Sequence, residues 1–153
     1  MTINDTEQAA AALYADADPD PNGLALRLGD CRIDLRSNSP ELLAELKAYF
    51  AHVVVAPDTP ADMEVIAIER EIADIGVTFT DWAREPGKTG RKDAYLDIPD
   101  GRLVLKVRTG MLFLQSKSQR IAAGPCLEYD NQVTNFINAQ YMNWLQQRNW
   151  LIC

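Results

Sequence analysis

The chain has 153 residues, of which 47% are hydrophobic and 24% are charged, and this composition is typical of one globular domain. It contains no apolar run near the roughly 20 residues that a membrane-spanning helix needs, and its first residues do not resemble a secretory signal. Three cysteines without C-x-x-C spacing favour reduced thiols and a cytoplasmic location over a disulfide framework or a thiolate metal site.

The net charge of −7 is distributed unevenly along the chain. Residues 1–80 hold five basic and fifteen acidic side chains, a net charge of −10, whereas residues 84–120 hold nine basic and four acidic ones, a net charge of +5. Such an asymmetry indicates either a surface for an anion or an acidic partner, or an ordinary solvated strand face.

The first elements are predicted from breakers and alternation. Residues 1–22 read as a flexible arm or a short docked helix, because an alanine-rich stretch is followed by an Asp- and Pro-rich breaker. Residues 24–28 and 31–36 alternate apolar and polar side chains around Gly29-Asp30, which predicts a hairpin.

A helix, a central strand and a polar loop are expected next. Ser39-Pro40-Glu41 is a helix start, with Ser39 as the cap and Pro40 at the first helical position. Residues 63–68 are almost continuously apolar and predict a central strand, and residues 82–92 read as a loop.

The second half predicts a meander followed by a long helix. Strands are expected over 95–98, 103–107, 111–114 and 119–123, and a helix over 131–147. The expected fold is therefore α+β: an antiparallel sheet of hairpin and meander packed with two main helices, in one domain over 23–153.

The last helix has an unusual polar face, and an apolar stretch follows it. Its polar side chains are Asn and Gln without a charge before Arg148, and a neutral amide face is easier to desolvate than a charged one. Asn135 and Asn138 are therefore candidates for an interface with a second domain, a partner protein or a second copy. Three residues after the helix are further interface candidates: Trp150, Leu151 and Ile152. They read as the start of a buried strand, which predicts that the chain is the front part of a larger protein.

Candidate chemistry in the chain is sparse. Gly87-Lys88-Thr89 lacks the first glycine and the strand–helix context of a phosphate-binding loop, and no nucleophile site is organised around Cys126. Candidate binding residues are Lys106, Arg108 and Thr109, with Lys88 and Arg91, because an Arg fork and backbone amides can hold a phosphate or carboxylate. The acidic pI of about 4.6 argues against nucleic acid.

Several stretches resemble HPr kinase-related proteins, specifically the HprK-related kinase B group. The stretch from Gly124 through Asn138 and Trp144-Leu145 to Cys153 resembles the region just before that family's kinase core. Residues 102–111, and residues 35–39 with Leu46 and Tyr49-Phe50, are similar to its N-terminal region.

This resemblance implies a non-catalytic N-terminal accessory domain that regulates an HPr serine kinase-type core or recruits its substrate. ATP and magnesium are then expected only with the kinase core, since the family's ATP loop, catalytic acid and metal ligands have no counterparts in these residues. Two other readings stay open: a free-standing module that binds an anionic ligand or acidic protein through the basic 84–120 face, and a small enzyme with a deep polar pocket.

Overall fold

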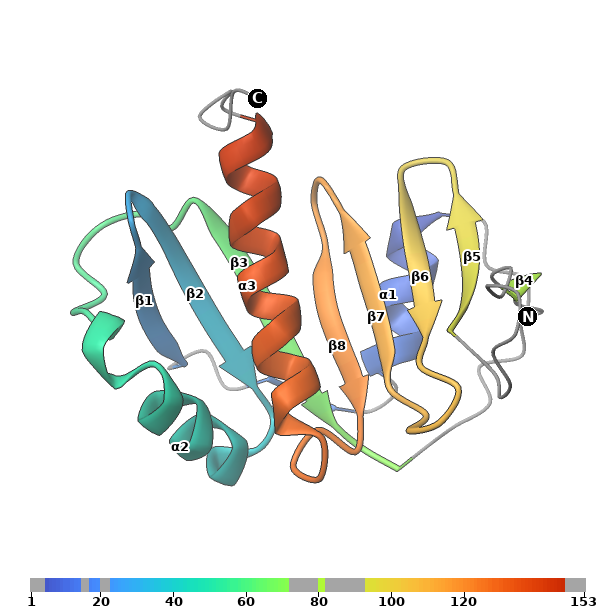
Figure 1. Ribbon diagram of the computed structural model, residues 1–153, viewed down its shortest axis with the longest axis horizontal. Helices are drawn as coiled ribbons and strands as arrows, with labels where there is room; N and C mark the ends of the chain where they lie inside the picture. The colour runs from blue at the N-terminus through green and yellow to red at the C-terminus, as the bar shows by residue number, and fades with distance from the viewer. Residues whose placement is uncertain (1–4, 15–16, 20–22, 72–79, 82–92, 148–153) are drawn as a thin grey trace, which may run out of the picture.

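The computed structural model describes residues 5–14, 17–19, 23–71, 80–81 and 93–147. The helices and strands of these residues form one mixed sheet with helices on both faces (Figure 1). In chain order they are α1 (Thr6–Tyr14), β1 (Leu24–Leu28), β2 (Cys31–Ser37), α2 (Pro40–Tyr49), the short 3-10 helix η1 (Ala51–Val53), β3 (Met63–Glu69), β4 (Thr80–Asp81), β5 (Ala94–Ile98), β6 (Gly101–Leu105), β7 (Leu112–Ser116), β8 (Arg120–Gly124) and α3 (Asp130–Gln147).

The α+β class is confirmed, but the expectation of a purely antiparallel sheet is wrong. The strand order is β1-β2-β3-β8-β7-β6-β5-β4, and β3 lies parallel to both of its neighbours, β2 and β8. The physical reason is the crossover through α2, which returns the chain to the starting end of the sheet before β3 begins, as a parallel pair requires. The predicted hairpin β1–β2 and the meander β5–β8 are antiparallel as expected.

The two faces of the sheet carry separate cores. On one face α2 and α3 cover the apolar sides of β1, β2, β3, β7 and β8, and α3 crosses in front of the sheet in Figure 1. On the other face α1 contacts β7 and β8 and lies behind the sheet in the same view. The central strand β3 supplies both cores, because Val65 and Ala67 point to the first face and Ile66 and Ile68 to the second.

Helix α1 lies within the stretch expected to be an arm or a docked helix, and it is held at both ends. The Thr6 hydroxyl donates to the Asp100 carboxylate at 2.7 Å, and the Arg70 guanidinium donates to the carbonyls of Ala12 and Leu13 at 2.9 Å each. A cation at the last carbonyls of a helix satisfies groups that otherwise have no helical partner. This helix is therefore a packed part of the domain.

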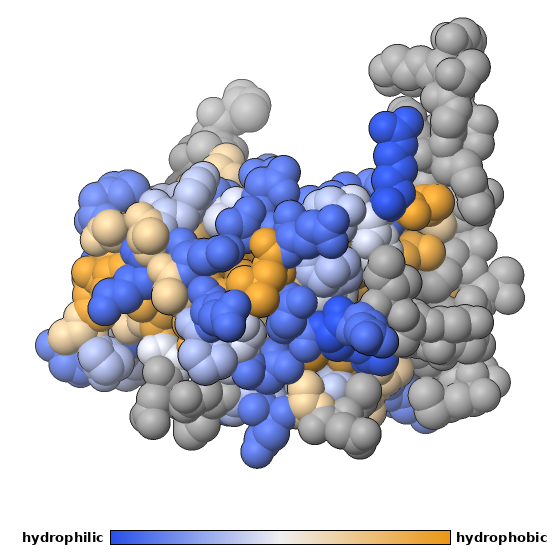
Figure 2. Space-filling view, turned by 90° about the horizontal axis from the view of Figure 1, so that it is seen from below, coloured by the Kyte–Doolittle hydropathy of each residue, from blue (hydrophilic) through white to orange (hydrophobic). Residues whose placement is uncertain are grey.

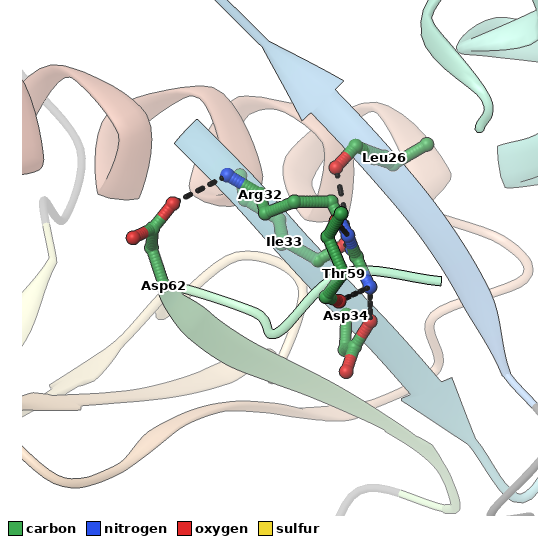
Figure 3. Close-up of polar contacts among 6 residues, drawn as sticks. All are labelled: Leu26, Arg32, Ile33, Asp34, Thr59 and Asp62. Atoms are coloured by element: carbon green, nitrogen blue, oxygen red, sulfur yellow. Dashed lines mark hydrogen bonds and ion pairs between the residues drawn. The ribbon is translucent and has the colours of Figure 1, made fainter. Parts of the chain in front are cut away.

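A buried arginine fastens the β1–β2 hairpin to the loop that follows η1. The Arg32 side chain is 4% exposed, and its guanidinium donates to Asp34 at 2.7 Å and to the Ile33 carbonyl at 2.9 Å (Figure 3). The same group also donates to the carbonyl of Leu26 and to the hydroxyl and carbonyl of Thr59 at 3.3–3.4 Å. Because its donors are used inside the fold, Arg32 has a structural role.

The start of α3 is fixed by the end of β3. The Glu69 carboxylate accepts from the Leu127 amide at 2.8 Å, and the Cys126 thiol donates to the Ile68 carbonyl at 3.3 Å. Helix α2 begins as predicted, with the Ser39 hydroxyl accepting from the Leu42 amide at 3.1 Å.

The surface at one end of the molecule is mixed in character. Seen from below, hydrophilic residues predominate and hydrophobic ones gather in separate patches (Figure 2). Among the described residues, the exposed large hydrophobic side chains are Tyr49, at 56%, and Met142, at 43%.

Candidate functional site

A groove of about 520 Å³ lies between α3 and strands β6 and β7. This volume is within the range of small-ligand sites, roughly 300–1,000 Å³. Its lining residues come from the start of β5, from β6, from β7 and from one side of α3: Asp93, Arg102, Val104, Lys106, Phe113, Gln115, Asn131, Gln132, Asn135, Phe136 and Ala139.

The alternation of β6 and β7 explains the floor of the groove. Arg102, Val104 and Lys106 are spaced by two residues and share one face of the sheet, while Leu103 points into the core beneath α1. In the register of the sheet, Val104 lies opposite Phe113 and Arg102 opposite Gln115. The floor therefore has an apolar centre formed by Val104 and Phe113. Arg102 and Gln115 lie at one end of this centre, and Lys106 lies at the other.

Helical spacing explains the wall. Asn131, Asn135 and Ala139 recur every fourth residue along α3, so they lie above one another on one side of the helix. Phe136, 9% exposed, contacts Phe113 with ring centroids 5.0 Å apart, and this contact joins the wall to the floor.

Both cations of the groove are paired with carboxylates of the meander. Lys106 Nζ lies 2.6 Å from Asp93, and the Arg102 guanidinium donates to the two oxygens of Asp97 at 2.6 and 3.2 Å. Arg102 also lies 4.6 Å from the ring centroid of Tyr95. The side chains of both pairs are substantially exposed, so the pairs contribute little to stability and leave the cations accessible to a ligand.

The Arg102–Asp97 pair changes the proton affinity of both partners. The hydrogen bond from Arg102 lowers the pKa of Asp97, and the same hydrogen bond raises the pKa of Arg102. Asp97 therefore stays ionised to lower pH than an isolated aspartate.

Side-chain amides are oriented by contacts behind the groove. The Thr109 hydroxyl donates to Gln132 Oε1 at 3.1 Å, and Gln140 Nε2 donates to Gln115 Oε1 at 3.3 Å. Gln140 is 2% exposed, so a polar residue of the predicted amide face is in fact a buried support.

The groove brings together Lys106 and Asn135, one residue from each of the two predicted sites. Arg108 is exposed in the β6–β7 turn and Asn138 is half-buried on α3, and neither lines the groove. Thr109 acts behind the groove through Gln132.

The turn that carries Arg108 uses its own backbone amides. The amides of Thr109 and Gly110 both donate to the Lys106 carbonyl, at 3.1 and 2.8 Å. These two amides therefore donate within the turn. The sequence had led us to expect that they bind an anion instead. Lys88 and Arg91, together with Trp150, Leu151 and Ile152, lie outside the described residues.

Sequence reasoning did not single out Asp93, Gln115 or Phe136 as residues of a site. The alternation of Arg102, Val104 and Lys106 was a signal that these side chains share a face. The sequence held no signal that α3 lies beside that face, because this contact joins segments far apart in the chain.

The buried cysteine is chemically quiet. Burial raises the pKa of the Cys126 thiol to about 12, so the reactive thiolate is scarce at neutral pH. Within the described residues, no group of three or more His, Cys, Asp or Glu side chains is arranged to hold a metal ion. In the same part of the chain no helix has the length and apolar character needed to cross a membrane.

Comparisons with known proteins gave no match: no family model, no curated protein and no solved structure is significantly similar to this chain.

Proposed function

We propose that this chain is a non-catalytic accessory domain of an HPr serine kinase-related phosphotransferase, and that it contacts the kinase core or its substrate through the groove between α3 and β6–β7. In this proposal ATP and magnesium bind the kinase core, and the present chain supplies a docking surface.

One observation carries the proposal. The two longest stretches that resemble the HPr kinase-related proteins, residues 102–111 and the described part of 124–153, form β6 with its following turn and α3 with the loop before it. They supply the β6 side of the floor and the wall of the groove, and β7 supplies the rest of the floor. Two separate segments that carry the resemblance thus meet at one surface with a ligand-sized concavity, which is what a shared docking function requires.

The described chemistry supports binding. The groove combines an apolar floor with oriented amides and two accessible cations, and protein interfaces combine an apolar centre with a polar rim in the same way. Asn135 and Ala139 are exposed on the wall, so a partner can reach them without unfolding the domain.

The test is titration of the chain with the HPr kinase-type catalytic core of the same organism, followed by calorimetry. Asn135→Trp fills the groove and should weaken binding at least tenfold, a change of about 1.4 kcal/mol. Gln146→Trp, an exposed substitution on α3 that does not line the groove, is the matched control and should leave the affinity unchanged. Absence of binding, or equal effects of both variants, would refute the proposed docking surface.

A second candidate is a free-standing module that binds an anionic ligand or acidic protein through the basic 84–120 face. The presence of Arg102 and Lys106 in one groove favours it. The spread of its basic residues over separate places counts against this candidate. Arg108 lies in the β6–β7 turn, and Arg120 lines a different, small cleft beside Gln140. This candidate predicts binding of an acidic protein by the chain without any kinase core.

A further inference from the structure

We infer that the groove between α3 and β6–β7 recognises the carboxylate groups of an acidic segment of a partner protein, with one apolar side chain of that segment on the groove floor. This inference rests on the proposed docking function and names the chemistry of the partner. It follows from the kind of hydrogen-bonding group that the groove can offer.

The oriented amides are donors towards a ligand. The Met111 amide donates to the Thr109 hydroxyl at 3.3 Å, and that hydroxyl in turn donates its proton to Gln132 Oε1. This bond occupies one lone pair of the Gln132 oxygen and orients the amide, and the NH2 group remains as a donor for a ligand. The same holds for Gln115, whose oxygen accepts from Gln140.

The two cations of the groove add further hydrogen-bond donors. Lys106 carries three N–H groups and Arg102 carries five, and neither side chain has an acceptor. Against these donors, Asp93 is the charged acceptor that lines the groove. A ligand that matches this lining must therefore be rich in acceptors, and carboxylates are the protein groups that accept most strongly from Arg and Lys.

Both cations already hold carboxylates. Asp93 at 2.6 Å from Lys106, and Asp97 at 2.6 Å from Arg102, mark positions in which a carboxylate of a partner could stand. An incoming carboxylate can replace Asp93 or share Lys106 with it. This exchange keeps the number of charged contacts nearly constant, so the net gain must come from the floor and the amides.

The floor supplies that gain. Val104 is half-buried and lies beside Phe113 and Phe136, so it supplies most of the exposed apolar surface of the floor, and covering it with one aliphatic or aromatic side chain removes that surface from water. The phenyl rings are 6% and 9% exposed, so they offer no face on which nucleic-acid bases can stack. A protein segment with glutamates around a leucine matches the lining better than a polynucleotide.

The first test uses a short fluorescein-labelled peptide in which glutamates flank a leucine, with a glutamine-for-glutamate peptide as the matched probe. We expect the glutamate peptide to bind at least about tenfold more tightly in anisotropy titrations, and salt to weaken it. Lys106→Gln should remove most of this preference, whereas Lys117→Gln, an exposed lysine outside the groove, should retain it.

Two further variants separate recognition from simple charge attraction. Asp93→Asn removes the competing carboxylate and should tighten binding of the glutamate peptide by about three- to tenfold. Gln115→Glu keeps the acceptor for Gln140 but removes the NH2 donor, and it should weaken the same peptide. A tighter complex from one variant and a weaker one from the other would not arise from a purely structural role of these residues.

The outcomes are distinguishable from those of the docking proposal. Equal binding of the two peptides, binding of neither at millimolar protein, or unchanged binding by Asp93→Asn would overturn the carboxylate inference. Competition by free glutarate as effective as by the peptide would also overturn it, because the partner segment would then be unnecessary. The docking surface itself would stand in each case if Asn135→Trp still blocked the kinase core.

Discussion

Arg32 and Asp62 are joined by two hydrogen bonds, one to a side chain and one between backbones. The Arg32 amide donates to the Asp62 carboxylate at 2.8 Å (Figure 3), and the Asp62 amide donates to the Arg32 carbonyl at 2.7 Å. Asp62 immediately precedes β3, so this double contact sets the position at which the parallel strand begins beside β2.

Replacing this buried arginine should destabilise the domain. Arg32→Met removes the buried hydrogen bonds from the guanidinium to the carbonyls of Leu26 and Ile33 and its ion pair with Asp34, so the free energy of unfolding should fall by about 3 kcal/mol. Urea denaturation measures this change. Arg27→Met, an exposed residue directly opposite on β1, is the control and should cost less than about 0.5 kcal/mol. Equal effects would mean that the guanidinium contacts contribute little.

How far the sequence predicts this fold is clear from β3 and its neighbours. The nearly continuous apolar run of residues 63–68 predicted a central strand, and this is confirmed. The partners of β3 were not predictable, because parallel pairing depends on the long connection through α2 and on the return of β8, and neither leaves a local turn signal. The alternation of residues 24–28 and 31–36, by contrast, sits on either side of a two-residue turn, so that hairpin was predicted with its turn.

The groove was likewise predictable from the sequence only in part. The lack of charge on α3 singled out Asn135, and the basic charge of 84–120 singled out Lys106. Their meeting in one groove depends on the placement of α3, which Glu69 and Cys126 set from the end of β3. These contacts join residues that are 58 positions apart in the sequence, and they have no local signature.

A carboxyl pair between α2 and α3 should make stability depend on pH. The hydrogen bond with Asp130 is the main cause that raises the pKa of Glu45, with burial and the charges of Asp130, Glu41 and Glu69 acting in the same direction. The stabilising contribution of protonated Glu45 is present below its unfolded pKa, about 4.3, and is lost as pH rises through its folded pKa.

Glu45→Gln should therefore stabilise the domain at pH 7 and have little effect at pH 3.5. Denaturant midpoints at the two pH values measure the difference, with Glu7→Gln, at an exposed position of α1, as the control. A Glu45→Gln variant that is equally stabilised at both pH values would contradict the carboxyl-pair explanation.

Cys126 should resist alkylation in the native protein. Its thiol is 0% exposed and its pKa is raised by burial to about 12, so iodoacetamide should leave it unmodified even at pH 9. Mass spectrometry of the peptide that contains it, with and without urea, makes the measurement. Rapid native alkylation would mean that the loop before α3 opens readily.

The buried side chains of α3 should contribute more to the stability of the domain than its exposed side chains. Ile137 is fully buried, and Ile137→Ala should cost about 3–4 kcal/mol because it leaves a cavity. Met142 is 43% exposed, and Met142→Ala should change the stability by less than about 0.5 kcal/mol. Chemical denaturation of both variants tests the docking of the helix, and similar costs would place Ile137 outside the core.

The parallel contact of β3 with β8 has a consequence for how the chain folds. Residues 24–69 contain β1, β2, α2 and β3, and residues 94–124 contain the meander β5–β8, so each half holds its own strand pairs: short turns join the antiparallel ones, and the crossover through α2 joins β2 to β3. The two halves join along one seam, β3 against β8, which closes a much longer loop and carries a larger entropic cost. We expect this seam to form last during folding and to open first in native-state exchange, so that a cut between the halves would yield two fragments able to reassociate.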